Sequence, residues 1–130
     1  MEILTLIIKQ QYFNEILSGD KKKETREIRP NTQKKYVHFY DTATGATLQP
    51  EDINEDSQNV GAQPRHYDAI RFCVGYAADR PTALVKVEDA KINTVHYEDG
   101  EPMTYEEKGK KYVAAQIVYD LGDIIESPNV

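Results

Sequence analysis

The first residues of the chain show two hydrophobic patterns in succession, one typical of a strand and one of a helix. Residues 2–9 (EILTLIIK) are rich in Ile and Leu and alternate weakly, which predicts a mostly buried strand. In residues 10–18 the apolar side chains recur at i, i+1, i+4 and i+5, so they share one face of a helix. Gly19 follows directly, and glycine tolerates the left-handed backbone that ends many helices. We therefore expect a core-packing helix that ends at Gly19.

The next segments are shorter and more polar. Residues 21–29 (KKKETREIR) lie between a Gly-Asp pair and a proline, which frame a short extended piece. If this piece is a strand, one of its faces carries alternate residues, namely Lys22, Glu24, Arg26 and Ile28. Residues 31–39 then favour a short helix with Asn31 or Thr32 as its N-cap.

Residues 41–66 have few apolar positions and contain glycines, prolines and several acidic residues. A connection of this length is uncommon inside a compact domain. We predict a long inserted loop with one helical turn near residues 51–55. The loop is either a plain variable insertion or a functional lid.

The rest of the chain predicts strands. Residues 67–76 alternate clearly, residues 82–95 form one long or bent strand, and residues 111–121 form another after a polar loop over 100–109. The order is strand, helix, strand, loop and then about three strands. This order predicts an α+β fold in one domain over residues 1–130, with a curled, mainly antiparallel sheet.

Charge is unevenly distributed along the chain. The 130 residues include 16 Lys and Arg against 22 Asp and Glu, which gives a net charge of −6. The basic segment, residues 21–35, carries a net charge of +5, so the remainder carries −11. A basic segment on an acidic body indicates one local anionic partner, because screening confines its field to about 8–10 Å. The alternative is a solvated basic strand with flanking loops.

Several classes of protein are excluded by composition and motifs. No apolar run approaches the roughly 18 residues of a membrane span, and no secretory signal is visible, so we expect a cytoplasmic protein without a membrane partner. Cys73 is the only cysteine, which excludes an internal disulfide and a Cys-based zinc site. The three histidines lack ligand spacing, and phosphate-loop and dinucleotide motifs are absent, so we expect no metal and no cofactor.

The sharpest chemical feature lies in the basic segment. In a strand, Glu24 and Arg26 project on one face, and an arginine beside a carboxylate keeps it ionised and oriented. Lys21 at the mouth of such a site could bind phosphate, or act as a general base if desolvated. The alternative is a surface ion pair worth at most about 1 kcal/mol.

This stretch resembles the signature of the ASCH domain family, which belongs to the PUA-like superfamily. The signature I-x-x-G-x-K-x-x-E-x-R is matched in order and spacing by Ile16, Gly19, Lys21, Glu24 and Arg26. Residues 67–72 and 83–88 look like later barrel strands of the family, and the likeness omits about 41–66 and 97–110. The resemblance implies a small PUA-like β-barrel with one or two flanking helices and a cleft lined by Lys21, Glu24 and Arg26.

PUA-like domains commonly bind RNA or modified bases, so the resemblance implies a binding domain for RNA or a (modified) nucleoside or nucleotide. Glu24 would accept a hydrogen bond from a base edge, beside Lys21 and Arg26. Tyr12 and Tyr76 are candidates for stacking on a base. Candidates for contact with nucleic-acid phosphates are Lys22, Lys23, Arg29, Lys34 and Lys35.

Two other functions stay open. One bacterial ASCH branch cleaves N4-acetylcytidine with a lysine, a threonine nucleophile and a glutamate. Lys21 matches that lysine, but Glu24 stands at the threonine position, Thr25 would point to the opposite face, and Glu88 is a candidate third residue. A small amidohydrolase acting on an acylated nucleoside would thus use Lys21 as base and Glu24 as nucleophile or acid. The other alternative is a protein-interaction domain, and the oligomeric state is open.

Overall fold

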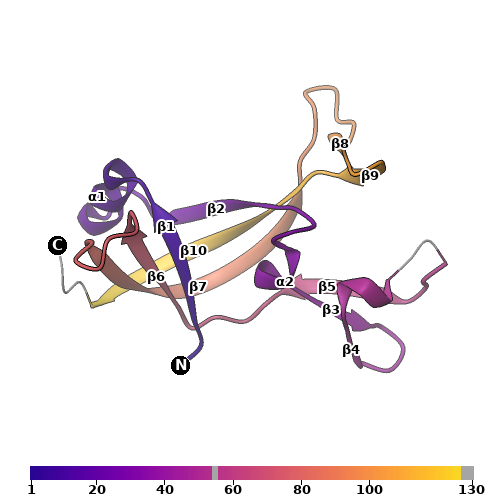
Figure 1. The fold of residues 1–130 in the computed structure, drawn as a ribbon, viewed down its shortest axis with the longest axis horizontal. Helices are drawn as coiled ribbons and strands as arrows, with labels where there is room; N and C mark the ends of the chain where they lie inside the picture. The colour runs from indigo at the N-terminus through magenta and orange to yellow at the C-terminus, as the bar shows by residue number, and fades with distance from the viewer. Residues whose placement is uncertain (54–55, 127–130) are drawn as a thin grey trace. The chain divides into compact units, whose positions relative to one another are not determined.

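The computed structural model describes residues 1–53 and 56–126, and most of them are in strands, with two α-helices (Figure 1). The chain forms two compact units. The first unit comprises residues 1–25, 66–90 and the described part of 118–130, and the second comprises residues 26–65 and 91–117. The α+β class is consistent with this content of strands and helices, whereas the single domain over 1–130 stays a prediction.

The elements follow one another in a β-rich order: β1 (Ile3–Ile8), α1 (Gln10–Ser18), β2 (Lys23–Ile28), α2 (Gln33–Tyr36), β3 (Val37–Asp41), β4 (Thr47–Leu48), the 3-10 helix η1 (Pro50–Asp52), β5 (Val60–Pro64), β6 (Ala69–Val74), β7 (Thr82–Thr94), β8 (Thr104–Glu107), β9 (Lys110–Val113) and β10 (Ala115–Glu126). One sheet has the strand order β1-β6-β7-β10-β2, a second has the order β4-β3-β5, and β8 pairs with β9.

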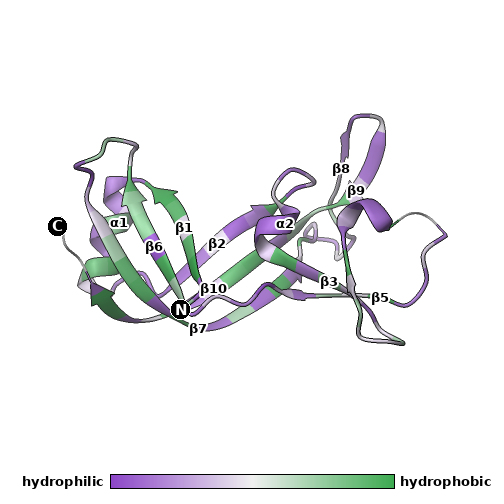
Figure 2. Ribbon diagram, turned by 60° about the horizontal axis from the view of Figure 1, so that its bottom comes forward, coloured by the Kyte–Doolittle hydropathy of each residue, from purple (hydrophilic) through white to green (hydrophobic). Residues whose placement is uncertain are grey.

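The core of the first unit follows from the alternation in its strands. β1 pairs in parallel with β6, with Leu6 opposite Phe72, and β6 pairs antiparallel with β7. The strands turn relative to one another, so the sheet of this unit is curled, and hydrophobic residues dominate β1 and β6 (Figure 2). The largest fully buried side chains of the unit, each under 2% exposed, form its core: Leu6, Phe13, Ile70, Phe72, Val85, Cys73 and Tyr119.

The predictions for the first helix and the strand after it are confirmed. α1 spans Gln10–Ser18, and Gly19 ends it in the left-handed region with φ +86°. The Gly19 N–H donates to the Ile16 carbonyl oxygen at 3.2 Å, which satisfies one of the last carbonyls of the helix. β2 begins two residues later than expected, and Glu24, Arg26 and Ile28 are less exposed than the residues between them. The predicted sharing of one face by these residues therefore holds.

The second unit contains more regular structure than its sequence predicts. Residues 41–66 hold β4, η1 and β5 instead of one long loop, and both strands pair antiparallel with β3. The expected helical turn is η1 at Pro50–Asp52, while residues 54–55 lie outside the described part. α2 has Thr32 as N-cap but ends at Tyr36, because Val37 begins a run of β-branched and aromatic side chains that favours a strand.

The prediction of a polar loop over residues 100–109 is wrong, because β8 and β9 form a hairpin there. Lys108 and Gly109 form its two-residue turn with φ +51° and +80°, the combination that a type I′ turn requires. The expected strand over residues 111–121 is divided at Ala114 into β9 and β10. Among the described residues, no helix combines the length and the apolar composition needed to span a membrane.

Candidate functional site

Three of the residues singled out from the sequence gather around Lys21 in the first unit. The Lys21 ammonium lies 3.9 Å from Glu24 Oε2 and 5.5 Å from the centroid of the Tyr12 ring. Glu24 is 7% exposed, whereas 41% of Tyr12 faces solvent. We call Tyr12, Lys21 and Glu24 the Lys21 cluster. It combines a buried carboxylate, a partly exposed cation and an accessible aromatic face.

The local sequence explains why these groups meet. Gly19 turns the chain back at the end of α1, and the Lys21 N–H donates to the Glu15 carbonyl oxygen at 3.0 Å. One residue later, the Lys22 carbonyl oxygen accepts a hydrogen bond of 2.8 Å from the Leu121 N–H of β10. The turn is thus fixed at both sides, and the two-residue period of β2 then directs Glu24 inward.

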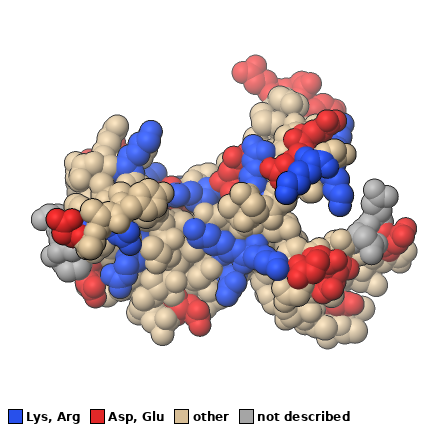
Figure 3. All heavy atoms as spheres, in the orientation of Figure 1, with Lys and Arg blue, Asp and Glu red and all other residues tan. Residues whose placement is uncertain are grey.

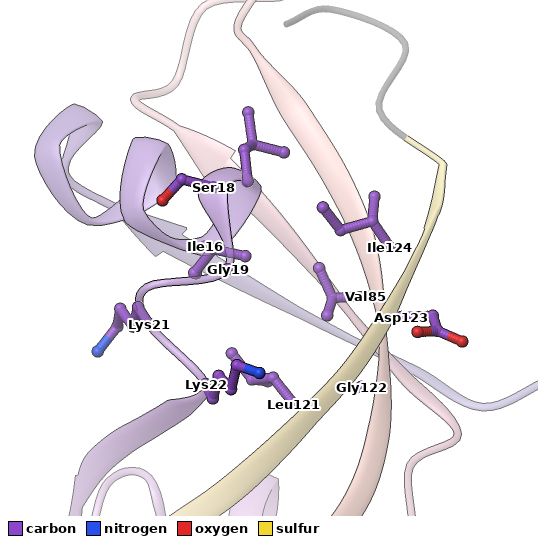
Figure 4. Close-up of a pocket in the computed structure, with 11 residues that line it drawn as sticks. Ile16, Ser18, Gly19, Lys21, Lys22, Val85, Leu121, Gly122, Asp123 and Ile124 are labelled. Atoms are coloured by element: carbon purple, nitrogen blue, oxygen red, sulfur yellow. The ribbon is translucent and has the colours of Figure 1, made fainter.

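A hollow of about 350 Å³ borders the same turn of the first unit. It lies between α1, β7 and β10, and two lysines, one aspartate and an apolar wall line it, including Leu17, Lys21, Lys22, Val85, Leu121, Asp123 and Ile124. In Figure 4 the Lys22 side chain extends toward Leu121, whereas the Lys21 ammonium points away from the hollow. Lys21 therefore stands at the rim, between the hollow and Glu24.

The other predicted ligand-binding residues lie elsewhere. Neither Glu24 nor Arg26 lines this hollow. Arg26 is half-buried two residues further along the inward face of β2, and it belongs to the second unit. Tyr76 is 83% exposed in the turn between β6 and β7. The structure thus brings Tyr12, Lys21 and Glu24 together, and it does not bring Arg26 or Tyr76 to the hollow.

Three of the five candidate phosphate contacts form ion pairs with carboxylates. Lys23 Nζ donates to Asp120 Oδ1 at 2.5 Å, Arg29 lies 2.6 Å from Glu27, and Lys34 lies 3.3 Å from Glu51, counted between the nearest nitrogen and oxygen. Lys35 lies over the ring of Tyr36, and Lys22 lines the hollow. The positive charge of the basic segment is therefore partly compensated where it lies.

Two of these pairs shift the pKa of a partner. The hydrogen bond to Glu27 raises the pKa of the exposed Arg29 above its ordinary value. A backbone hydrogen bond at Glu51, followed by the bond from Lys34, lowers the pKa of the Glu51 carboxyl. Both directions favour the charged forms, so both ion pairs hold at neutral pH.

The residues proposed for hydrolysis are only partly assembled. Lys21 and Glu24 are in contact, but Thr25 is exposed on the opposite face of β2, as its position in the strand predicts. Glu88 lies 3.9 Å from Lys86 and touches Gly122 of β10. Cys73 is fully buried in β6. Within residues 1–53 and 56–126, no three His, Cys, Asp or Glu side chains are grouped so as to hold a metal ion.

Sequence patterns did not indicate the apolar wall of the hollow. Val85, Leu121 and Ile124 come from β7 and β10, and their positions alternate like those of any half-buried strand. Only the pairing of distant strands brings them beside the turn that carries Lys21. No local signal separates such residues from ordinary core positions.

Comparisons with known proteins give no match. No protein-family model, no curated protein and no solved structure matches this chain. The Lys21 cluster and the hollow beside it are therefore the observations from which a function can be inferred.

Proposed function

We propose that this chain is an ASCH-type, PUA-like domain that binds RNA or a (modified) nucleoside or nucleotide beside Lys21 and Glu24. The observation that supports this proposal best is the Lys21 cluster, in which one cation lies beside both a buried carboxylate and an exposed aromatic ring. This combination is uncommon at an ordinary surface, because burying a carboxylate is costly unless it has partners. The Lys21 ammonium, 3.9 Å from Glu24, offsets part of this cost.

Each member of the cluster suits one part of a nucleotide. A carboxylate such as Glu24 accepts hydrogen bonds from the exocyclic amine of a base. The exposed face of Tyr12 offers a surface on which a base can stack, which is how unpaired bases are commonly bound. Lys21 and Lys22 supply cations for a phosphate group.

The size of the hollow favours one nucleoside at a time. Its volume of about 350 Å³ is near the lower end of the range for small-molecule sites, roughly 300–1,000 Å³. The apolar wall formed by Leu17, Val85 and Ile124 would contact a sugar or a ring face. With one base held at Tyr12 and Glu24, the sugar or a neighbouring base of the same ligand would occupy the hollow.

The proposal predicts that Lys21→Ala weakens the binding of a ten-nucleotide single-stranded RNA and of cytidine monophosphate. We expect the dissociation constant to rise about tenfold, equivalent to ~1.4 kcal/mol, because the variant removes the cation between Glu24 and Tyr12. Isothermal titration calorimetry at low salt measures the effect. Lys86→Ala is the matched control, since Lys86 is an exposed lysine of the same unit that also pairs with a glutamate. The proposal fails if nothing binds, or if both variants weaken binding equally.

A second candidate, an amidohydrolase, is favoured by the 3.9 Å separation of Lys21 and Glu24. Hydrolysis of N4-acetylcytidine would add water across the amide bond and release cytidine and acetate. Lys21 would act as base and Glu24 as nucleophile or acid. Chromatography of the products tests this candidate, and turnover that survives Lys21→Ala would contradict the assigned mechanism. A chain that binds neither RNA nor nucleosides would favour a protein-interaction domain.

A further inference from the structure

The second unit contains a larger hollow that shares no residue with the Lys21 cluster. It has a volume of about 710 Å³ and lies between the β8–β9 hairpin and the segment around η1. One wall is apolar, with Phe39, Pro50 and Ile53, and the other carries Lys110, Lys111 and Tyr112. In Figure 3 it is the open notch at the right, with basic side chains on the hairpin side. Among the residues that the structure describes, no Asp or Glu lines it.

A series of stacked groups leads to this hollow. The Arg29 guanidinium lies 4.1 Å from the centroid of the Tyr105 ring, and the Tyr105 and Tyr112 rings stack at 5.5 Å with planes 22° apart. Tyr105 and Tyr112 face each other across the hairpin, so their backbones fix the stack. Burial raises the pKa of the Tyr105 hydroxyl, as expected for a ring packed between neighbours. Tyr112 ends the series at the wall of the hollow.

The lysines of the hairpin favour an anionic ligand in the same hollow. Lys110 and Lys111 follow the Lys108–Gly109 turn directly, and both line the hollow. Glu107 and Glu106 stand opposite them on β8, but neither glutamate lines the hollow. On the other side, Glu51 is paired with Lys34. An anionic group would therefore settle at the hairpin side of the hollow.

We propose that this hollow is a second ligand site, which binds a nucleotide with its base between Tyr112 and Phe39 and its phosphate at Lys110 and Lys111. A base placed there extends the series that begins at Arg29 and Tyr105, and base–aromatic stacking is tolerant of base identity. The volume falls within the range of nucleotide-sized sites. The site goes beyond the function proposed for the Lys21 cluster, because it uses other residues in the other unit.

The test uses the full chain carrying Lys21→Ala, so that the contribution of the Lys21 cluster is weakened. Adenosine monophosphate, adenosine and inorganic phosphate are titrated by calorimetry at low salt. We expect adenosine monophosphate to bind at one site per chain, and more tightly than adenosine or phosphate. If adenosine monophosphate does not bind to this protein while its circular dichroism spectrum is native, the inference is overturned, whatever the Lys21 cluster binds.

Substitutions in the hollow then test separately where the phosphate and the base of the ligand bind. The double variant Lys110→Gln/Lys111→Gln should raise the dissociation constant of adenosine monophosphate about tenfold and that of adenosine less than twofold. Lys108→Asn is the control, because it removes a lysine from the turn of the same hairpin, where Asn tolerates a positive φ. Equal losses in the double variant and the control would contradict the site.

The aromatic half is tested with Tyr112→Leu, which should weaken both adenosine and adenosine monophosphate, whereas Tyr112→Phe keeps the ring and should preserve binding. Loss of binding in both variants would show that the ring is not the contact and would contradict the stacking.

A pentameric oligoadenylate distinguishes the source of the ligand. Tighter binding of the pentamer than of the monophosphate identifies an RNA strand, and equal or weaker binding identifies a free nucleotide.

Discussion

Asp68 joins the beginnings of two paired strands. Its side chain accepts a hydrogen bond of 2.7 Å from the Glu2 N–H, and its own N–H donates to the Glu2 carbonyl oxygen at 2.8 Å. His66 Nε2 lies 3.1 Å from the other carboxylate oxygen. The bond from Glu2, then the one from His66, lowers the pKa of Asp68 below its ordinary value of 3.8. The reciprocal bonds hold β1 in register with β6.

This lowered pKa predicts a dependence of stability on acid. Well above pH 3.8 the Asp68 carboxyl is ionised in the unfolded state too, and it contributes its full stabilisation. As the pH falls through the lowered pKa the contribution is lost. Asp68→Asn should therefore lower the urea midpoint at pH 7 and have a smaller effect at pH 3. Asp79→Asn changes an aspartate in the exposed β6–β7 turn and is the control. If Asp68→Asn lowered the urea midpoint by the same amount at pH 7 and at pH 3, the prediction would be contradicted.

At the scale of residues, the sequence predicted which side chains of β2 face inward but not what surrounds them. The positions of Glu24 and Arg26 on one face follow from the two-residue period of a strand. The contact of Lys21 with Tyr12 follows less directly, because it depends on how Gly19 redirects the chain. The residues of the larger hollow, such as Phe39 and Tyr112, are 73 positions apart in the sequence, and no local pattern relates them.

At the scale of elements, Gly19 controls both the end of α1 and the direction of the turn that carries Lys21. A Cβ at this position would meet nothing within 4 Å, so a substitution affects only the backbone, which has φ +86°. The left-handed conformation costs an L-residue roughly 1–2 kcal/mol. A change in stability caused by substituting Gly19 therefore reflects the backbone conformation and not side-chain packing.

We expect Gly19→Ala to lower the free energy of unfolding by about 1 kcal/mol. Gly19→Asn should cost less, since asparagine visits the left-handed region more readily. Urea unfolding followed by circular dichroism measures both variants. An alanine variant as stable as the original chain, or less affected than the asparagine variant, would contradict this account of the helix end.

Elements with a clear hydrophobic period in their own sequence were predictable. Elements that depend on hydrogen bonds to residues far away in the sequence were not. β1 and α1 follow their patterns closely. The division between β9 and β10 at Ala114 has no such signal, because residues 111–119 contain no glycine, proline, asparagine or aspartate that would mark a break. It arises where the Ala114 N–H donates to Met103 and its carbonyl oxygen accepts from Val95, two partners outside this stretch. β4 and β5 likewise exist because β3 pairs with them.

At the scale of the whole molecule, the net charge of −6 limits how strongly RNA could bind through phosphates. Seven cations in the basic segment would give a slope of log affinity against log salt near −5, at about 0.7 per contact with a single strand. Four of the seven pair with carboxylates, namely Lys21, Lys23, Arg29 and Lys34. A phosphate must replace each of these carboxylates, so we expect a slope shallower than −5.

Releasing one of these cations should strengthen RNA binding. Glu51→Gln removes the partner of Lys34 and should lower the dissociation constant for single-stranded RNA a few-fold at low salt. Glu98→Gln changes the net charge equally at an exposed position of the same unit and is the control. Fluorescence anisotropy over a series of salt concentrations provides both affinity and slope. Equal effects of the two variants would contradict a role for the basic segment.

The first unit is assembled from three separated stretches of chain, with Leu6 and Tyr119 both in its core. During translation, β1 emerges from the ribosome long before β6, and β10 emerges last. The second unit, 26–65 with 91–117, has all of its residues synthesised before Tyr119 is added. The hydrophobic side chains of β1 must therefore stay exposed until β10 has been made, because only then can the core of this unit close over them.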